Sequence, residues 1–411
     1  MFPIHSAKRK HNVVIIALVT ACCILGDSML YIALPIYWRE AGLDGVWQVG
    51  VLLAVNRFIR LPLDPFVGWL YEKMSLKIGL LFAVILSVMT TAGYGLVKGF
   101  LAWLILRCIW GLAWSFLRIW GLSTVAVYGE QHKQGEAMGL YNGLYRMGSL
   151  VGMLVGGVLT PFLGLTWISL SFGLVSGIGV VILGVFFQNE ASLSKTKSTD
   201  RKKGILGLDI LKDYTLIMSS SFVVTFIIQG VLMATLSSLI IYHFGEEVEI
   251  LNVVIAASAL SGILQALRWM WEPFLATRVG IWSDGSKGRK PFFIGSLLLG
   301  SIGLPMLAFS SIPLIWIFFT LCVLLTSTAL TTLMDAMAGD RSHEAGTVRF
   351  FTYYTVVQDT GAAFGPFVGY LLLSLTFGYE MLYIGCAVLL LVLAVGWFIQ
   401  FKKEKQQVSI L

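Results

Sequence analysis

Charged side chains recur at helical spacing inside an otherwise apolar stretch, RFIRLPLDPF, over residues 57–66. Counting along it by threes and fours gives Arg57, Arg60, Asp64 and Gly68. Positions spaced in this way lie on one side of a helix, so the three charges form a stripe. The two arginines are suited to contact an anion, although they can equally pair with acids on neighbouring helices. Pro62 and Pro65 favour a kink in the same helix.

A second stripe lies in the segment 100–126, where helical spacing gives Arg107, Gly111, Trp114 and Arg118. Its two arginines are about 16 Å apart along a helix. Asp27, in the segment 13–37, lies roughly 15 Å from the outer end of its helix, and Arg107 lies roughly 10 Å from the outer end of its own. We expect these two side chains to meet.

A buried carboxyl group beside a guanidinium is a candidate proton carrier. Burial favours the neutral form of the acid, whereas the neighbouring cation favours the charged form. A group held between these two influences can load and release a proton as its surroundings open. We predict that Asp27 and Arg107 couple transport to protons, and a static ion pair that holds the helices together is the alternative.

Membrane-spanning helices must position these charges. The chain of 411 residues is 57% hydrophobic and 12% charged, with a mean hydropathy of +0.84, unlike soluble proteins. Continuous apolar windows of about 20 residues recur throughout, which fits spanning helices and excludes the alternating strands of a membrane barrel. The sequence predicts an all-α membrane protein with twelve spans, at 13–37, 46–71, 76–96, 100–126, 138–162, 166–187, 215–243, 251–279, 291–309, 313–337, 350–375 and 379–401.

A polar, basic linker at 188–214 divides these spans six and six. We therefore expect an N-terminal six-helix bundle over 1–187 and a C-terminal six-helix bundle over 215–411. Most of the 29 lysines and arginines lie at the chain ends or in loops that would share their side, whereas Arg39 and Lys98 lie in the opposite loops. The positive-inside rule then places both termini in the cytoplasm of a multi-pass protein of the cell (inner or plasma) membrane.

The two halves repeat one another. GWLYEKMSLK (68–77) follows the second span, and GIWSDGSKGRK (280–290) follows the eighth. GMLVGG in the fifth span and GPFVGY in the eleventh place Gly152 opposite Gly365. Parallel repeats of six spans occur in one large class of secondary transporter, whose substrate site lies between the halves. Glycines at 148, 152 and 156 have the spacing that allows close packing of helices.

These motifs resemble those of the major facilitator superfamily, and within it the twelve-span, drug- and siderophore-exporter-like branch of proton antiporters. The resemblance implies gating roles for Gly68, Glu72, Lys73, Lys77, Gly280, Asp284, Lys287, Arg289 and Lys290. RCIWGLAWS, which contains Arg107, is similar to the fourth-span signature of proton-driven members. GPFVGY resembles the glycine-proline element of exporters, but that element is typical of the fifth span, where Met153 takes the expected proline position.

Polar and aromatic residues of the spans complete the candidate site. For substrate binding we predict Arg57, Arg60, Asp64, Arg118, Arg146, Tyr31, Trp110, Trp114, Gln229, Gln265, Arg268, Glu272, Tyr354, Gln358 and Asp359. Aromatic residues at helical spacing are more often packing residues, so only Trp110 and Trp114, beside the arginine stripe, are retained. Asp335, close to the end of its predicted span, is assigned to the cytoplasmic loop network.

The charge balance of the spans predicts the sign of the substrate. In the first half, five arginines stand against Asp27 and Asp64, whereas the second half is balanced. An excess of arginine concentrates anions and grips carboxylate or phosphate groups. We therefore predict proton-coupled export of an amphiphilic organic anion, such as a siderophore-like, phosphorylated or carboxylated compound, by alternating access.

Three other functions stay open: a multidrug efflux pump, an anion-proton symporter and a non-transporting receptor. An enzyme is not predicted, because the sequence shows no metal-ligand spacing, phosphate loop or nucleophile motif. We expect no metal and no cofactor, with a proton gradient as the energy source and a monomer as the working unit. The net charge of +7 reflects topology and an attraction to anionic lipid, not to nucleic acid.

Overall fold

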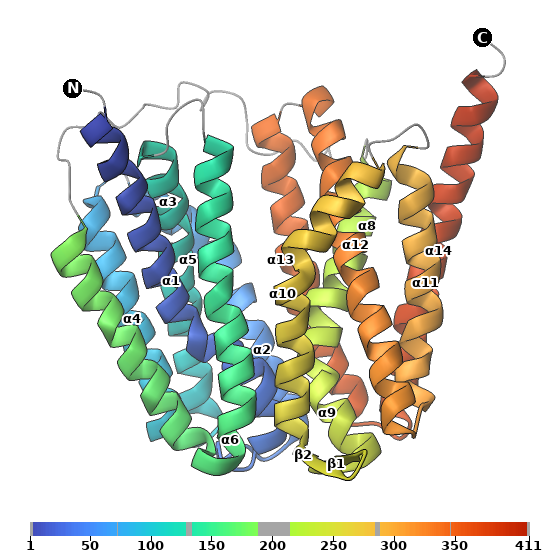
Figure 1. Cartoon of the computed structure of the whole chain (residues 1–411), viewed down its shortest axis with the longest axis horizontal. Helices are drawn as coiled ribbons and strands as arrows, with labels where there is room; N and C mark the ends of the chain where they lie inside the picture. Colours follow the sequence, from blue (N-terminus) through green and yellow to red (C-terminus); the bar gives the residue numbers. More distant parts are fainter. Residues whose placement is uncertain are drawn as a thin grey trace. The chain divides into compact units, whose positions relative to one another are not determined.

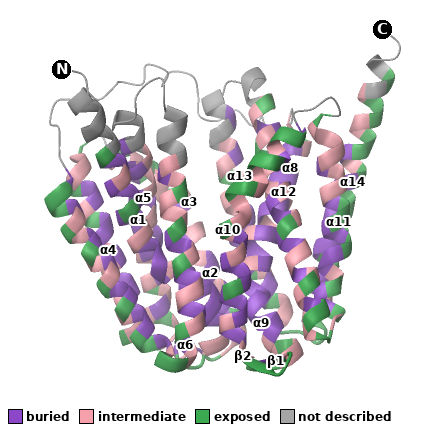
Figure 2. Ribbon diagram, in the orientation of Figure 1, coloured by how far each residue is buried: buried purple, intermediate pink, exposed green. Residues whose placement is uncertain are grey.

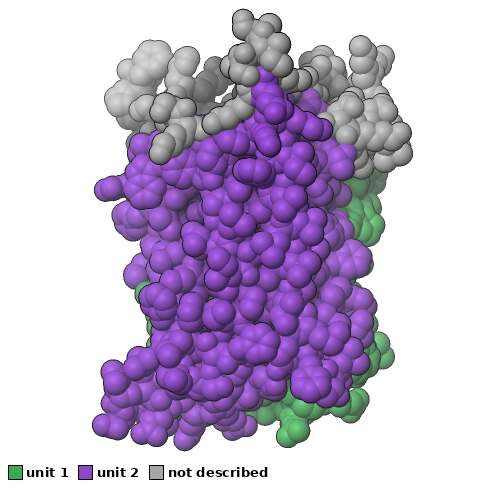
Figure 3. Space-filling model, turned by 90° about the vertical axis from the view of Figure 1, so that its right-hand side faces the viewer, with its two compact units in different colours: residues 1–204, 258–269 green, residues 205–257, 270–411 purple. Residues whose placement is uncertain are grey.

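The chain folds almost entirely into helices. The structure, a computed structural model, describes residues 3–71, 73–128, 134–187, 214–283, 288–345 and 347–408. It divides into two compact units, which Figure 3 colours separately. Unit 1 comprises residues 1–204 and 258–269, and unit 2 comprises residues 205–257 and 270–411. The division falls inside one helix, α10 (Ala257–Ser283), so most of the first half of this helix packs with unit 1.

Unit 1 consists of helices that run beside one another (Figure 1). They are α1 (Pro3–Tyr37), α2 (Val46–Phe58), α3 (Arg60–Tyr71), α4 (Leu76–Leu96), α5 (Phe100–Tyr128), α6 (Gln134–Phe186) and residues 258–269 of α10. The predicted second span is interrupted at Ile59, because Pro62 has no N–H to donate to the carbonyl of Phe58. Ile59 keeps helical angles of φ −64° and ψ −25°, so α2 and α3 form one span.

A single glycine separates the two predicted spans within α6. Gly164 has φ 72° and ψ 166°, a conformation that side chains disfavour, and it lies at a kink between two helices. The Glu40 side chain accepts a hydrogen bond from the N–H of Leu165 at 3.2 Å, which satisfies a donor at the start of the second helix. The fifth and sixth predicted spans are therefore the two arms of α6.

Unit 2 contains helices and one hairpin. Its elements are α8 (Thr215–Thr225), η1 (Phe226–Leu232), α9 (Met233–Phe244), β1 (Glu247–Ile250), β2 (Val253–Ala256), the rest of α10, α11 (Arg289–Phe309), α12 (Pro313–Ala345), α13 (Thr347–Leu373) and α14 (Gly378–Val408).

The predicted start of the eighth span at 251 is wrong. Residues 247–256 form an antiparallel hairpin that turns at Leu251 (φ 51°) and Asn252 (φ 65°), and the helix begins only at Ala257. Apolarity alone does not separate a short strand from a helix.

The segment η1 is a π-helix, the rare form that carries one extra residue per turn. It interrupts the seventh predicted span between α8 and α9, and Gly230 within it packs against Gly365 of α13. Because Gly230 and Gly365 have no side chains, the two backbones can come into direct contact.

The membrane-spanning helices agree with the predicted number. Among the described residues, nine helices are long and apolar enough to cross a bilayer, and α6 is counted once among them. The long helices α10 and α13 fall outside that set; they contain polar residues such as Arg268 and Asp359. With these two helices and both arms of α6, the described chain has twelve spans.

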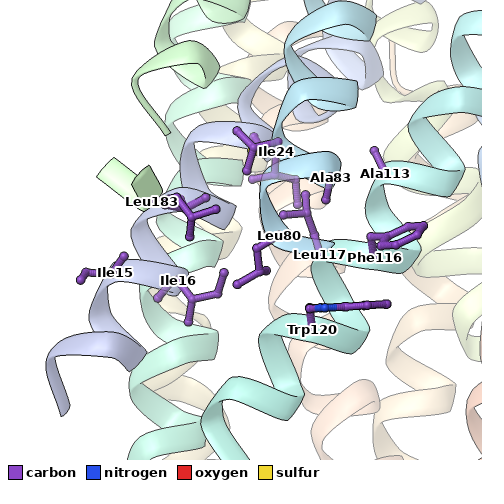
Figure 4. Packing of buried hydrophobic residues seen from close by; sticks show 14 of the residues in the cluster. Ile15, Ile16, Ile24, Leu80, Ala83, Ala113, Phe116, Leu117, Trp120 and Leu183 are labelled. Carbon is purple, nitrogen blue, oxygen red and sulfur yellow. The ribbon is translucent and has the colours of Figure 1, made fainter. Parts of the chain in front are cut away.

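Large apolar side chains cover the outward faces of the helices, for example Leu174, which is 75% exposed, and Phe162, which is 81% exposed. Figure 2 shows such exposed residues alternating with buried ones along helices such as α4 and α14. In unit 1 the buried side chains of α1, α4, α5 and α6 form a compact cluster around Ile16, Leu80 and Trp120 (Figure 4). The burial pattern is that of helices packed inward and surrounded by lipid.

The predicted glycine ladder packs helices closely. A side-chain carbon at Gly152 would lie 2.5 Å from the carbonyl oxygen of Leu25, and Gly148 and Gly156 meet Ala21 and Met29 on the same face of α1. In unit 2, glycines of α13 at 361 and 365 contact Phe222 and Gly230 in the same manner. The matched positions Gly152 and Gly365 therefore both bring their helix against the first helix of their half.

Candidate substrate and proton site

Asp27 of α1 and Arg107 of α5 are in direct contact, as the helical count predicts. The guanidinium Nη1 of Arg107 lies 2.5 Å from Oδ1 of Asp27, and its Nε donates to the carbonyl of Leu52 at 2.8 Å. The Arg107 side chain is fully buried, whereas that of Asp27 is 15% exposed. Tyr31, one turn further along α1, is buried as well. The pair is therefore a buried cation in contact with a carboxylate that is itself partly exposed.

The stripe on α2 and α3 is only partly buried. Arg60 is buried, and Arg57 and Asp64 are half-buried. The carboxylate of Asp64 accepts a hydrogen bond of 2.5 Å from the hydroxyl of Ser115 on α5. Ser115 was not among the predicted residues, although its place one residue after Trp114, on the charged helix, could have suggested it.

Aromatic rings of α5 and α6 form a row of successive contacts. The rings of Trp110 and Trp114 lie 6.2 Å apart, and Trp114 lies 6.1 Å from Tyr145. Tyr145 in turn lies 5.3 Å from Tyr141. Trp110 is buried in the apolar core cluster, whereas Trp114 and Arg118 are half-buried. Trp114 is therefore the better ligand contact of the two predicted tryptophans.

Two predicted arginines meet at a tryptophan that was not predicted. The guanidinium carbons of Arg146 on α6 and Arg268 on α10 each lie 5.5 Å from the ring centroid of Trp269. Arg268 and the nearby Gln265 are buried, and Arg146 and Trp269 are half-buried. All four residues belong to unit 1. The adjacency of Trp269 to Arg268 was the available sequence signal.

In unit 2 a carboxylate joins two predicted residues of α13. The phenol of Tyr354 donates to Oδ1 of Asp335 at 2.6 Å, and the amide of Gln358 donates to the same oxygen at 3.1 Å. Asp335 was assigned to the loop network at the end of its span, but α12 continues to Ala345, more than two turns further. Gln229 in η1, Glu272 in α10 and Asp359 in α13 are half-buried on their helices.

The loop-signature residues that the structure describes mostly hold helix ends. Lys77 donates to the carbonyls of Gly184 and Phe187 at 2.8 and 3.4 Å, where α6 ends. Arg289 bonds to Ala336 O at 2.6 Å and to Asp340 at 2.9 Å, and Lys290 pairs with Glu404. Lys73 lies 3.8 Å above the ring of Trp69, and Gly68 and Gly280 are half-buried within helices. Glu72, Asp284 and Lys287 lie outside the described residues.

Long apolar helices that enclose charged and polar clusters define a multi-span membrane transporter. The chain belongs to the major facilitator superfamily, because the model of that family matches residues 16–284 and 273–409. It is 25% identical over 366 residues to the multidrug resistance protein MdtG of Salmonella paratyphi A, and the match covers 87% of each chain. It is 30% identical over 122 residues to the human chromaffin granule amine transporter, a match that covers 29% of this chain and only 23% of that protein.

Solved transporter structures share the fold. A bacterial homologue of the human lysosomal transporter Spinster, inward-facing and unoccupied, superposes with a TM-score of 0.72 at 13% identity and covers 97% of both chains. The nucleoside transporter NupG, solved as a point mutant, superposes with a TM-score of 0.75 at 12% identity and covers 96% of this chain and all of that one. At these identities the likeness extends to the fold alone.

Proposed function

We propose that this transporter is a proton-coupled exporter in which Asp27 and Arg107 form the coupling site. The supporting observation is their contact in the interior of unit 1, with Arg107 fully buried and Asp27 partly exposed. A guanidinium stays protonated, so a proton that arrives at this pair can be accepted only by the carboxylate. Protonation of Asp27 removes the ion pair and leaves Arg107 with the Leu52 carbonyl among its partners. The packing of α1 against α5 then depends on the proton.

The preferred substrate is an amphiphilic organic anion. The membrane-spanning part of unit 1 carries six arginines against Asp27 and Asp64, namely Arg57, Arg60, Arg107, Arg118, Arg146 and Arg268. After the pairing of Asp27 with Arg107, the formal charge of this set is still positive. A field of that sign attracts carboxylates and phosphates, and the aromatic row beside it supplies apolar contact.

Broad multidrug efflux is the second candidate. It is favoured by the similarity to MdtG, a protein named for multidrug resistance, over 87% of both chains. Transport into vesicles of two dyes that share one ring system, one cationic and one anionic, separates the candidates. Preference for the anionic dye supports our proposal, whereas equal transport of both, or a preference for the cation, favours multidrug efflux.

Coupling is tested in proteoliposomes with an imposed pH gradient. Asp27→Asn keeps a hydrogen-bond acceptor beside Arg107 but cannot exchange a proton, so we expect gradient-driven flux to fall at least about tenfold while exchange without a gradient persists. Asp44→Asn, the same change at an exposed loop residue, should leave the flux unaltered. An unchanged response of Asp27→Asn to the gradient would remove Asp27 from coupling.

The orientation is also a proposal. Lysines and arginines cluster at both chain ends and in the loops that would share their side, so we propose that both termini are cytoplasmic. A tag at either end should be accessible to protease only after the cell membrane is permeabilised. Cleavage of a tag on intact cells would reverse this orientation.

A further inference from the structure

Tyr94 of α4 lies beside the contact between Asp27 and Arg107 in the interior of unit 1. Its ring stacks on that of Trp103 of α5, with 4.9 Å between the ring centroids. Trp103 and Arg107 are four residues apart, so they lie one turn apart on the same side of α5. Tyr94 and Trp103 are both buried, and Tyr94 interacts electrostatically with Arg107. The stacking therefore fixes the Tyr94 ring close to the guanidinium.

The same face of α4 packs closely against α1 next to Asp27. Thr91 is one turn before Tyr94 and contacts Gly26, where any side chain would collide with that of Thr91. Gly26 directly precedes Asp27 in the chain. The close approach at this glycine brings α4 to the depth of the ion pair. Three helices, α1, α4 and α5, therefore converge there.

The charged and titratable groups around the pair come from these three helices. They are Asp27 and Tyr31 of α1, Tyr94 of α4, and Arg107 and Cys108 of α5. From α2 the carbonyl of Leu52 reaches Arg107, and α6 packs against the opposite side of α1, where Gly152 meets Leu25. Asp27 is the one carboxylate in this set, so a proton taken up by the set near neutral pH belongs to Asp27.

Two polar atoms at this place make no hydrogen bond. Among the described residues, the hydroxyl of Tyr94 and Nη2 of Arg107 are buried and have no partner of suitable geometry. Nη1 and Nε of the same guanidinium contact Asp27 and the carbonyl of Leu52. A buried polar atom without a partner costs free energy. The hydroxyl of Tyr94 therefore contributes no hydrogen bond while the ion pair is intact, and a different state of the pair could use it.

We propose that Tyr94 is a positioning residue of the coupling site, and that its hydroxyl accepts a hydrogen bond from Arg107 when Asp27 is protonated. This inference rests on the proposed coupling function. The carboxylate takes up one proton and Arg107 keeps all of its own, so the ion pair ends and the buried cation needs another acceptor. A phenolic oxygen can accept from a guanidinium N–H. Tyr94 thereby favours the protonated state of Asp27.

The test variant is Tyr94→Phe, which removes the hydroxyl and keeps the ring on Trp103. Because the protonated state alone loses an acceptor, protonation of Asp27 should require a more acidic solution. The infrared band of protonated carboxyl groups is recorded against pH for the full chain in lipid nanodiscs, and Asp27→Asn identifies the part due to Asp27. In Tyr94→Phe the pH at half intensity of that part should fall by about one unit, a tenfold loss of proton affinity.

Thermal unfolding at two pH values separates positioning from a purely structural role. Well above the wild-type pH of half intensity, Asp27 is charged and the hydroxyl has no partner, so Tyr94→Phe should be at least as stable as wild type. Below that pH the variant should unfold at a lower temperature than wild type. A hydroxyl that only supports packing would cost the same stability at both pH values.

Two control variants remove buried hydroxyls elsewhere. Ser87→Ala removes the donor to the carbonyl of Cys23 at 3.2 Å, which joins the same helices, α4 and α1. Tyr383→Phe removes a buried phenol hydroxyl in unit 2 that lies 3.0 Å from Thr235. Both variants should unfold at a lower temperature than wild type at either pH. Neither should change the pH at half intensity of the Asp27 band.

The outcomes distinguish this inference from the function on which it rests. If Asp27→Asn leaves the band unchanged, Asp27 takes up no proton, and the coupling proposal fails together with the role of Tyr94. If Asp27 is protonated but Tyr94→Phe has the wild-type pH of half intensity, the role of Tyr94 alone is wrong. A shift to higher pH would also overturn it, because the hydroxyl would then favour the charged pair.

Discussion

Two carboxylates, one in each unit, are held by chemically different partners. Asp27 of unit 1 contacts a guanidinium, with 2.5 Å between Oδ1 and Nη1 of Arg107. Asp335 of unit 2 accepts hydrogen bonds from neutral groups, the phenol of Tyr354 at 2.6 Å and the amide of Gln358 at 3.1 Å. The first contact joins two opposite charges, whereas neither donor in the second contact brings a charge of its own.

The difference predicts how each site responds to the loss of a partner. Arg107 is fully buried, and a guanidinium cannot become neutral by releasing its proton, so it depends strongly on Asp27. Asp335 is exposed, and water can replace a lost donor. We therefore expect the Asp27–Arg107 contact to be more sensitive to the loss of a partner than the contacts of Asp335 with Tyr354 and Gln358.

The largest effect is expected for Asp27→Leu. It leaves the Arg107 guanidinium in the interior without the carboxylate that compensates its charge, which typically costs about 3 to 5 kcal/mol of folding stability. The midpoint of thermal unfolding in detergent should fall far more than for Asp335→Leu. Equal decreases in the unfolding midpoint for Asp27→Leu and Asp335→Leu would show that the two carboxylates contribute equally to stability.

Arg107→Leu should destabilise less than Asp27→Leu. The remaining Asp27 side chain is 15% exposed, so water can solvate its charge, whereas the Arg107 side chain is fully buried. The double variant Asp27→Leu with Arg107→Leu should then be more stable than the sum of the single losses implies, because neither charge is left behind. Strict additivity of the unfolding free energies would show that the two residues do not interact.

The smallest effects are expected in unit 2. Tyr354→Phe removes one neutral hydrogen bond to Asp335 and should cost about 0.5 to 1.5 kcal/mol, and Asp335→Asn should cost about as much. Both are measured by the same thermal unfolding in detergent. A loss from Tyr354→Phe as large as that from Asp27→Leu would mean that the Asp335 cluster stabilises unit 2 as strongly as the ion pair stabilises unit 1.

The sequence supports the fold and one contact for clear physical reasons. Spans of about 20 apolar residues are forced by bilayer thickness, and a buried charge such as Arg107 needs a partner at its own depth, which Asp27 provides. Glycine spacing likewise predicts close packing, and Gly152 lies against Leu25. These features can be predicted because each depends on the sequence of a single helix or on how deep a residue lies in the membrane.

What escaped prediction depends on which helix faces point at each other. Ser115 against Asp64, Asp335 against Tyr354, and Arg146 against Trp269 all join different helices, and rotation about a helix axis is not encoded in hydropathy. The hairpin at 247–256 was missed because its apolar residues continue the pattern of the adjoining helix. Side-chain partners of this kind require the packed structure.

The π-helical turn of η1 determines the direction in which the side chains of the following helix, α9, point. One surplus residue in a helix advances the later side chains by about 100° around the axis. In α9 that rotation brings the hydroxyl of Thr235 within 3.0 Å of Tyr383 and that of Ser238 within 2.9 Å of Tyr370. Deleting one residue between Phe226 and Leu232 would convert the turn to a regular α-helix and rotate both hydroxyls away from their tyrosines. This short insertion therefore sets how α9 is rotated about its own axis.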